Sequence, residues 1–414
     1  MSDLDRRSLS ALLERPALAR LLAALNGGGE ETRIVGGAVR NALIGRPVME
    51  VDCATTAAPE VTVERARSAG FKPVPTGIEH GTVTVVVDRE PFEVTTLRED
   101  VETNGRHAVV RFGRDFSADA HRRDFTINAL SLSVDGKLHD YTGGEADLAA
   151  GRVRFIGDAA TRIREDYLRI LRFFRFHSEY ADGPPDPEGL AASSRERAGL
   201  DILSKERVRA ELLKLLVTRR ASDMLDVLLA HGFITNLIGG PGEFGRFRRV
   251  SSFSDDPVDR LAALAVMTEK QADLLRDRLR LSNGEHERLR AYGKALAVLK
   301  TQTRPVDALA IRRFVAKQGL APVDLAAHAV TGEPTPVFEA DARPALEAYR
   351  SGAEPIPVFP LRGGDLIAEG IPKGPHVGEI LADARHTWMA EGCPTGEEYA
   401  ADLKERVLAS LGGR

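Results

Sequence analysis

Three acidic residues in the first 100 positions have the types and spacing of metal ligands. Glu50 and Asp52 flank one valine in the apolar stretch GRPVMEVDCATT, and Glu93 lies in PFEVTT. If these stretches are strands, side-chain alternation places Glu50 and Asp52 on one face. Converging carboxylates are ligands for Mg²⁺, which prefers hard oxygen atoms. A surface strand that carries acids without a function is the alternative.

A pair of glycines precedes these acids. Gly36 and Gly37 follow the segment TRIV, and residues 38–49 separate them from Glu50. A glycine turn at the start of a helix offers backbone N–H groups to a phosphate. Glycine turn, paired acids and a later acid can together bind a nucleoside triphosphate and activate a hydroxyl for in-line attack.

The elements that must position these residues belong to a mixed front region. The sequence predicts a strand over 32–35, a helix over 38–44 that ends at Gly45, and a hairpin over 79–100 with its turn at Asp88–Pro91. After Gly151 the pattern of Leu, Arg and Glu is helical, and strand signals nearly vanish. The predicted fold class is therefore α+β, with roughly 260 residues of helical domains after the front domain.

The composition of the chain indicates which broad class of protein it belongs to. The chain has 414 residues, 43% of them hydrophobic and 29% charged, which is typical of a soluble protein with several domains. Two distant cysteines suit a reducing cytosol and exclude a disulfide framework, so we expect a cytoplasmic protein. No apolar run is long enough for a membrane span, and the N-terminus reads as an amphipathic helix. The net charge of −4 means that phosphates must be bound by local basic patches.

Nine stretches, in order from about residue 34 to 216, carry a resemblance to a known family. They are VGGAVRNALIG, EVDCATT, HGTVTVVV, EVTTLRED, RRDFTINAL, DYTGGEADL, RFIGD, REDYLRILRFFRF and ERVRAELLKLL. Together they resemble the nucleotidyltransferase superfamily that includes DNA polymerase β, and within it the class II branch of tRNA CCA-adding enzymes and bacterial poly(A) polymerases. A weaker match, GGDLIAEGIPKGPHVGEILADARHTW, resembles the family's C-terminal segment.

The resemblance implies a division of the chain into four domains. A nucleotidyltransferase head, with a mixed sheet and helices like that of polymerase β, would span 1–150. All-α neck, body and tail domains would span 151–240, 241–340 and 341–414, with base selection in the neck and tRNA contacts in the tail.

The resemblance also implies roles for the glycine turn and the acids. Gly36, Gly37 and Arg40 would hold the triphosphate. Glu50 and Asp52 would be the catalytic metal ligands, with Glu93 as a third ligand or else a plain strand acid. Most members have Asp at the positions of Glu50 and Asn41. We expect the Asn41 departure to cost a helix-surface ion pair only.

The stretch RRDFTINAL matches the family's ribose-handling motif. Arg123, Asp124 and Asn128 suit that role, because an acid can accept from a ribose hydroxyl while an amide and a guanidinium reach sugar and phosphate oxygens. The alternative is the start of a helix capped by Asp124, with the apolar residues Phe125, Ile127 and Leu130 on its inner face.

The stretch REDYLRILRFFRF lies in the most basic segment of the chain. Residues 151–178 hold seven arginines and three acids, and a charged solvent face is the simple explanation. In the family, Asp166 and Arg169 stand in for a pairing base on a neck helix over 163–178. Asp166 would accept from the exocyclic amine shared by cytosine and adenine, and Arg169 would donate to the ring nitrogen beside it. Arg172 and Arg175 would fix the helix, the phosphates or the bases.

Residues 101–121 read as a mobile hairpin around an Asn-Gly turn. In the family this region is the loop that switches the enzyme from C to A addition, and it looks full length here. It carries Arg106, His107, Arg111 and Arg114, which argues against an enzyme that adds only CC.

The expected function is addition of CCA to the 3′ end of tRNA without a nucleic-acid template. CTP and ATP would be the substrates, Mg²⁺ the cofactor and tRNA the partner, with no membrane and no obligate protein partner. The alternatives are a poly(A) polymerase, an enzyme that adds only CC or only A, and a non-catalytic RNA-binding homologue.

Overall fold

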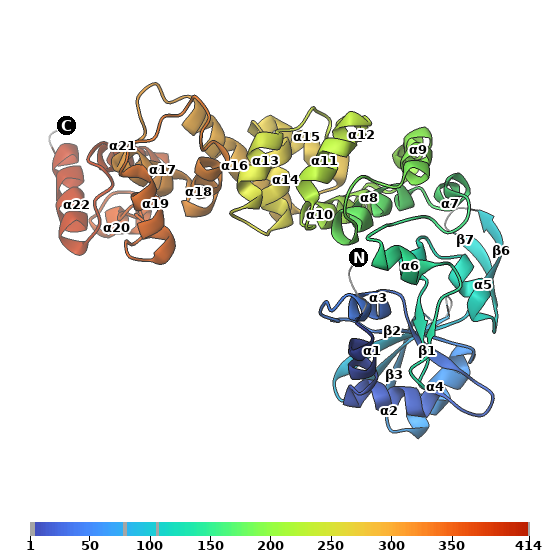
Figure 1. The fold of residues 1–414 in the computed structure, drawn as a ribbon. Helices are drawn as coiled ribbons and strands as arrows, with labels where there is room; N and C mark the ends of the chain where they lie inside the picture. Colours follow the sequence, from blue (N-terminus) through green and yellow to red (C-terminus); the bar gives the residue numbers. More distant parts are fainter. Residues whose placement is uncertain (1–4, 78–80, 105–106, 413–414) are drawn as a thin grey trace. The chain divides into compact units, whose positions relative to one another are not determined.

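The computed structural model describes residues 5–77, 81–104 and 107–412. The chain divides into two compact units, residues 1–231 and residues 232–414 (Figure 1). Within the described ranges, no helix is long and apolar enough to cross a membrane. The finer division into four domains stays a prediction.

The first unit is built on a mixed sheet. In the described part of the chain this sheet has seven strands in the order β3-β4-β5-β2-β1-β8-β9. Strands β2 and β5 pair in parallel, and every other pair of neighbouring strands in this sheet is antiparallel. The strands are β1 (Thr32–Val35), β2 (Asp52–Thr55), β3 (Lys72–Gly77), β4 (Thr82–Val87), β5 (Glu90–Thr96), β8 (Ser131–Leu132) and β9 (Leu138–His139). The predicted mixed sheet is confirmed.

The predicted hairpin between β4 and β5 is confirmed, with a tighter turn than expected. Val87 pairs with Glu90, so only Asp88 and Arg89 form the turn, and both have positive φ, 51° and 72°. Such a two-residue turn matches the right-handed twist of its strands. The register places Glu93 opposite Thr84 and, on the other side of β5, next to Asp52 of β2.

Helices near the N-terminus cover the sheet. Leu18, Leu21, Leu22 and Leu25 recur at helical spacing in α2 and are all buried. Figure 1 shows α2 and α4 beside the sheet, and both contact β4. The helices of this region are α1 (Arg6–Leu13), α2 (Pro16–Leu25), α3 (Gly37–Leu43) and α4 (Pro59–Ser68).

The rest of the first unit is mainly helical. Its elements are the two-stranded hairpin β6 (Arg98–Asn104) and β7 (His107–Phe112), the 3₁₀ turns η2 (Thr126–Asn128) and η3 (Arg197–Ile202), and the helices α5 (Phe116–His121), α6 (Gly144–Ala149), α7 (Ala159–Glu165), α8 (Leu168–Tyr180), α9 (Pro187–Arg195), α10 (Lys205–Leu216) and α11 (Ala221–Ala230). Ile170, Leu171, Phe173 and Phe174 form the buried face of α8.

The prediction of one continuous neck helix over 163–178 is wrong. Helix α7 ends at Glu165, and Asp166 has extended backbone angles of −156° and 105° before α8 begins. The Asp166 carboxylate accepts from the N–H of Leu168 at 3.1 Å. A side chain that bonds the backbone two residues on favours a turn over a continuing helix. Helical spacing alone does not reveal this break.

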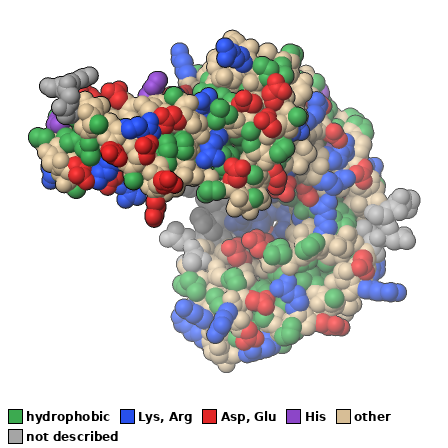
Figure 2. All heavy atoms as spheres, turned by 90° about the vertical axis from the view of Figure 1, so that its left-hand side faces the viewer, with side chains coloured by type: hydrophobic (Ala, Val, Ile, Leu, Met, Phe, Trp, Pro, Cys, Tyr) green, Lys and Arg blue, Asp and Glu red, His purple; other side chains and the backbone are tan. Residues whose placement is uncertain are grey.

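The second unit is all helical among its described residues, as predicted. Glu333 forms ion pairs with Arg246, Arg249 and Lys300. Burial alone would raise the pKa of Glu333, but Arg246 and Lys300 lower it to about 2. Acidic and basic side chains are interspersed on the face shown in Figure 2. The helices are α12 (Phe233–Ile238), α13 (Phe244–Ser251), α14 (Pro257–Ala265), α15 (Glu269–Leu279), α16 (Asn283–Lys300), α17 (Ala308–Gln318), α18 (Leu320–Ala329), α19 (Ala342–Ser351), α20 (Gly363–Ala368), α21 (Pro375–Ala390) and α22 (Glu397–Gly412).

Gly144 provides a test of the packing beneath the RRDFTINAL segment. A Cβ atom at Gly144 would lie 2.1 Å from the carbonyl oxygen of Thr126, so the substitution Gly144→Ala must displace backbone. We expect it to cost about 1–3 kcal/mol of unfolding free energy, measured by urea denaturation. Gly284→Ala is the control, because a Cβ there meets no atom within 4 Å. An unchanged midpoint for Gly144→Ala would contradict this packing.

Candidate active site

A cavity of about 640 Å³ in the first unit brings most of the predicted site residues together. Residues from the sheet, from the segment after α5 and from α8 line it. The predicted residues among them are Gly36, Gly37, Arg40, Asp52, Glu93, Arg123, Asp124, Asn128, Asp166, Arg169, Arg172 and Arg175. Glu50 is not among the residues that line this cavity.

Asp52 and Glu93 form the acidic part of the wall. They are paired in the parallel register of β2 and β5, so their side chains leave the sheet on the same side. Asp52 opens onto the cavity, yet the surrounding atoms still desolvate it. Burial therefore raises its pKa, and the charges of Glu93 and Glu50 raise it further. Clustered carboxylate oxygens without a dominant cation fit a divalent metal ion that keeps substrate phosphates in its shell.

The expected position of Glu50 within the strand that carries Asp52 is wrong. Strand β2 begins at Asp52, so Glu50 precedes the strand. Among the residues that the structure describes, no group of three or more His, Cys, Asp or Glu side chains is arranged to hold a metal ion. The metal-binding roles of Glu50, Asp52 and Glu93 stay predictions.

The glycine turn shapes the cavity beside Arg40. Gly36 has a positive φ of 66°, and a Cβ there would lie 3.3 Å from Nη1 of Arg123. The Gly36 N–H donates to the carbonyl of Leu130 at 3.0 Å, so this N–H group is engaged within the protein. Gly36 therefore contributes a left-handed turn that favours glycine, and it lets Arg123 and the Asn128 carbonyl come close to the backbone. Its predicted nucleotide contact remains untested.

Arg40 lies in the cavity wall and is only 6% exposed. Its guanidinium donates to Oδ1 of Asn41 from Nε at 3.2 Å and from Nη2 at 3.0 Å, to the Tyr180 hydroxyl at 2.7 Å, and to Oδ1 of Asn128. All three partners are uncharged. Burial lowers the Arg40 pKa to about 10, which still leaves the side chain cationic at neutral pH. Asn41 thus bonds a buried arginine, and the expectation that its departure affects a helix-surface contact is wrong.

Asp124 anchors the RRDFTINAL segment. Its Oδ1 accepts from the Phe125 N–H at 2.9 Å and from Nδ2 of Asn128 at 3.2 Å, and its Oδ2 accepts from Nε of Arg172 at 2.7 Å. Burial alone would raise the Asp124 pKa, but Arg172 and Asn128 lower it below the usual value. The segment forms the short turn η2 after Phe125. The alternative of a helix capped by Asp124 is wrong.

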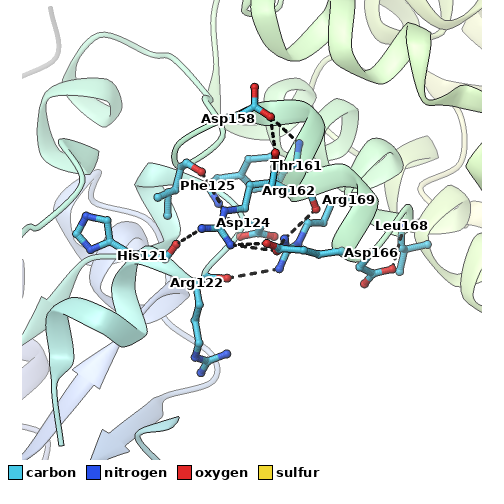
Figure 3. A network of polar contacts seen from close by, with 12 residues as sticks. His121, Arg122, Asp124, Phe125, Asp158, Thr161, Arg162, Asp166, Leu168 and Arg169 are labelled. Carbon is cyan, nitrogen blue, oxygen red and sulfur yellow. Dashed lines mark hydrogen bonds and ion pairs between the residues drawn. The ribbon is translucent and has the colours of Figure 1, made fainter. Parts of the chain in front are cut away.

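The break between α7 and α8 presents Asp166 and Arg169 to the cavity. Oδ2 of Asp166 accepts from Nη2 of Arg207 at 2.7 Å, while Arg169 donates to the carbonyl of Arg162 at 2.9 Å and binds Glu165. Figure 3 shows Arg162 and Arg169 reaching the backbone of His121 and Arg122. Each predicted base-reading side chain is therefore held by other segments. A solvent-facing charged helix, the alternative explanation, is wrong for this part of the segment.

Several polar residues of the cavity were given no role by the sequence analysis, although most of them lie in the stretches that carry the family resemblance. Asp119 holds both Arg122 and Arg123, and Tyr180 contacts Arg40. Arg207 lies in ERVRAELLKLL, which was matched to the family without a residue role. The full set of such polar residues is Thr82, Thr95, Arg98, Asp119, Arg122, Tyr180 and Arg207.

The hairpin predicted within residues 101–121 is confirmed by the pairing of β6 with β7. Arg106 lies outside the described residues, and the side chains of His107 and Arg111 lie outside the described side chains. Arg114 binds Glu30 at 2.9 Å and the Gly29 carbonyl at 2.6 Å.

The pair formed by Asp124 and Arg172 can be tested by unfolding. Arg172→Met leaves the 8%-exposed Asp124 without its arginine, which should cost about 3 kcal/mol in urea denaturation. Adding Asp124→Asn to Arg172→Met removes the buried charge and should recover part of that loss. Arg219→Met is the control, because its partner Asp182 is 78% exposed and the pair should contribute less than about 1 kcal/mol. A double variant no more stable than Arg172→Met would contradict this account.

Comparison with known proteins places the chain in a family. A family model described as "Poly A polymerase head domain" matches residues 32–154, and another, described as "Probable RNA and SrmB- binding site of polymerase A", matches residues 185–241. The protein named "CCA tRNA nucleotidyltransferase 1, mitochondrial" from Danio rerio is 37% identical over 389 residues, covering 86% of this chain and 83% of that protein. The "CCA-adding enzyme" of Limosilactobacillus fermentum is 30% identical over 375 residues, covering 89% and 90%.

Solved structures agree with these sequence matches. The Bacillus stearothermophilus CCA-adding enzyme in complex with CTP has a TM-score of 0.75 and 28% identity, covering 97% of this chain and all of that one. The Thermotoga maritima CCA-adding enzyme complexed with tRNA has a TM-score of 0.69 at 20% identity, which shows the shared fold. With identity of 30% or more over most of both chains, this chain belongs to the CCA-adding enzyme family of nucleotidyltransferases.

Proposed function

We propose that this chain adds CCA to the 3′ end of tRNA, using CTP and ATP and no nucleic-acid template. The 3′ oxygen of the RNA attacks the α-phosphorus, the bond from that phosphorus to the bridging oxygen breaks, and pyrophosphate leaves. One observation carries the proposal: a single cavity brings together the acids of β2 and β5, a set of arginines, and the pair Asp166 and Arg169.

Asp52 and Glu93 would hold divalent metal, with Glu50 as a further candidate ligand. Their hard oxygen atoms favour Mg²⁺ over softer ions. Such a metal ion makes a bound hydroxyl more acidic and offsets charge on the phosphates. The raised pKa of Asp52, which comes first from burial and then from the charges of Glu93 and Glu50, is consistent with this role, because a bound cation would offset those charges.

The arginines of the cavity supply the positive charge that a triphosphate needs. Arg40 is a fixed cation in the wall, while Arg123 and Arg172 are held by Asp119 and Asp124. Arg175 is bound to Glu211 and lies with its guanidinium carbon 4.2 Å from the ring centre of Phe176. Positioned donors of this kind favour phosphoryl chemistry because little reorganisation is needed when charge develops. Asp124 and Asn128, beside these arginines, are the candidates for the ribose.

Asp166 and Arg169 would select the base. Cytosine and adenine each present an amine, which donates to Asp166, beside a ring nitrogen that accepts from Arg169. Uracil and guanine present a carbonyl and an N–H group at these places, so both contacts fail. A buried mismatch costs about 1–3 kcal/mol for each lost partner.

The helices of the second unit would contact the tRNA. Acidic and basic side chains are interspersed on the face of the molecule shown in Figure 2, and the whole chain carries a net charge of −4. RNA binding would therefore depend on local arginines and lysines and weaken with added salt. A cytoplasmic location remains part of the proposal, alongside the mitochondrial names of some relatives.

An extension assay with sequencing of the 3′ end tests the proposal. The substrates are a tRNA without CCA, a tRNA that ends in CC, and an unstructured RNA, each with Mg²⁺ and all four NTPs. We expect addition to stop at CCA on both tRNAs, with little extension of the unstructured RNA. Long A tails would identify a poly(A) polymerase, and CC alone or A alone would show a partial activity.

The acids of the sheet edge are tested in the same assay. Asp52→Asn keeps the size of the side chain but removes its charge, so we expect addition to fall by at least about a hundredfold, because a bound metal contributes several kcal/mol. Asp88→Asn is the control, since Asp88 forms an exposed pair with Arg20 on the β4–β5 turn. Full activity of Asp52→Asn would overturn the assignment of the metal site.

Base selection is tested by Arg169→Met. We expect the preference for CTP over UTP in kcat/KM to fall by about 5- to 150-fold, the effect of one lost hydrogen-bond partner. Arg164→Met is the matched control, because Arg164 is 58% exposed and pairs with Glu196 outside the cavity. An unchanged preference in Arg169→Met would show that another residue reads the base.

A further inference from the structure

Tyr180 joins two parts of the cavity that the proposed function treats separately. It is the last residue of α8, the helix that begins next to Asp166 and carries Arg169. Its hydroxyl accepts from Nη2 of Arg40 at 2.7 Å, and the guanidinium carbon of Arg40 lies 3.8 Å from the centre of its ring. Tyr180 thus contacts Arg40 with both its polar and its aromatic parts.

Neighbouring contacts fix this end of α8 against α3 and the segment that follows it. Arg46 binds the Glu179 carboxylate, donates to the Glu179 carbonyl at 3.0 Å and lies 4.9 Å from the ring centre of Tyr180. On the other side, the ring of Phe176 stacks on Tyr180 with centroids 5.9 Å apart. Contacts other than the one with Arg40 therefore also hold Tyr180 in place.

The three partners of Arg40 are uncharged, which matters for a phosphate site. Their contacts use four of the five N–H donors of the guanidinium, one at Nε, one at Nη1 and two at Nη2. A carboxylate partner would cancel the charge of Arg40, whereas amide and phenol oxygens leave it in place for a nearby anion. Asn41 and Asn128 belong to the head, so Tyr180 is the partner that α8 provides.

We propose that Tyr180 is a positioning residue that holds Arg40 for the triphosphate and thereby links the triphosphate site to the base-selecting helix. This inference rests on the proposed function of the cavity. It predicts that a change at Tyr180 weakens binding of the triphosphate and leaves the choice of base unchanged. The reason is that Asp166 and Arg169 lie at the opposite end of α8 and have their own partners.

The test compares Tyr180→Phe, Tyr180→Leu and wild type. The phenylalanine variant keeps the ring and loses the hydroxyl, and the leucine variant loses both. Tyr349→Phe is the matched control, because Tyr349 in the second unit also contacts an arginine, Arg312, through its hydroxyl. The measurements are KM and kcat for CTP and ATP, the preference for CTP over UTP, and calorimetric binding of tripolyphosphate with Mg²⁺.

For Tyr180→Phe we expect KM for CTP and for ATP to rise by the same factor, about three- to tenfold, the effect of one net hydrogen bond. Tripolyphosphate binding should weaken equally, since this probe has no base or sugar. The value of kcat and the preference for CTP over UTP should stay within about twofold of wild type. Tyr180→Leu should show a larger rise in KM, and Tyr349→Phe none.

Two results would overturn the inference. Unchanged KM values and tripolyphosphate affinity in Tyr180→Phe would show that the hydroxyl does not position Arg40. A loss of base preference at unchanged KM would show that Tyr180 only supports the fold of α8. These results differ from a failure of the proposed function, in which wild type itself would add no nucleotide. Even in that case, weaker tripolyphosphate binding by Tyr180→Phe would support the positioning of Arg40 by Tyr180.

Discussion

A closed ring of polar contacts between α8 and the head holds the candidate active site together. Arg172 of α8 binds Asp124, Asp124 binds Asn128, and Asn128 accepts from Arg40. Arg40 then donates to Tyr180, which returns the ring to α8 two turns after Arg172. Because Arg40, Asp124 and Asn128 are buried, removal of one of their partners leaves a buried polar group unsatisfied. The ring therefore holds Arg40, the candidate triphosphate ligand, in place against α8, the helix that carries the candidate base-reading residue Arg169.

The arginines of the cavity differ in whether their hydrogen-bond partners are charged. Arg123, Arg172 and Arg175 each have a carboxylate partner, which offsets the cost of desolvating them. Arg40 has uncharged partners and keeps its field. Asp52 lies near Glu93 and Glu50, whose charges add to burial in raising its pKa, while Arg123 lowers it in part. Arg40 and the acids near Asp52 thus place charges of opposite sign in one cavity, and a triphosphate with its metal ions carries both signs.

The order of short motifs predicted the sheet and the hairpin, and 12 of the 13 residues predicted for the site line the cavity, together with polar residues that were not predicted. Local spacing could not predict contacts such as Arg207 with Asp166, since 41 residues separate them and only the folded chain brings them together. The break at Asp166 was missed for a related reason. Helical periodicity continues through the segment, and the turn depends on one side chain bonding the backbone at Leu168. Glu50 was misplaced because strand alternation was extended to a residue that precedes β2.

Selection of a base without a template requires that two side chains behave as a rigid edge. A free Asp and Arg would each lose rotamer entropy on binding, and the correct base would have to offset that loss every time. In this chain the rotamers of both side chains are already restricted in the folded protein, because Arg207 holds Asp166 and Glu165 holds Arg169. The backbone carbonyl of Arg122 adds a contact from the head. All these partners belong to the first unit, so the proposed chemistry and the proposed choice of base are both set there, which leaves the second unit for the proposed contacts with RNA.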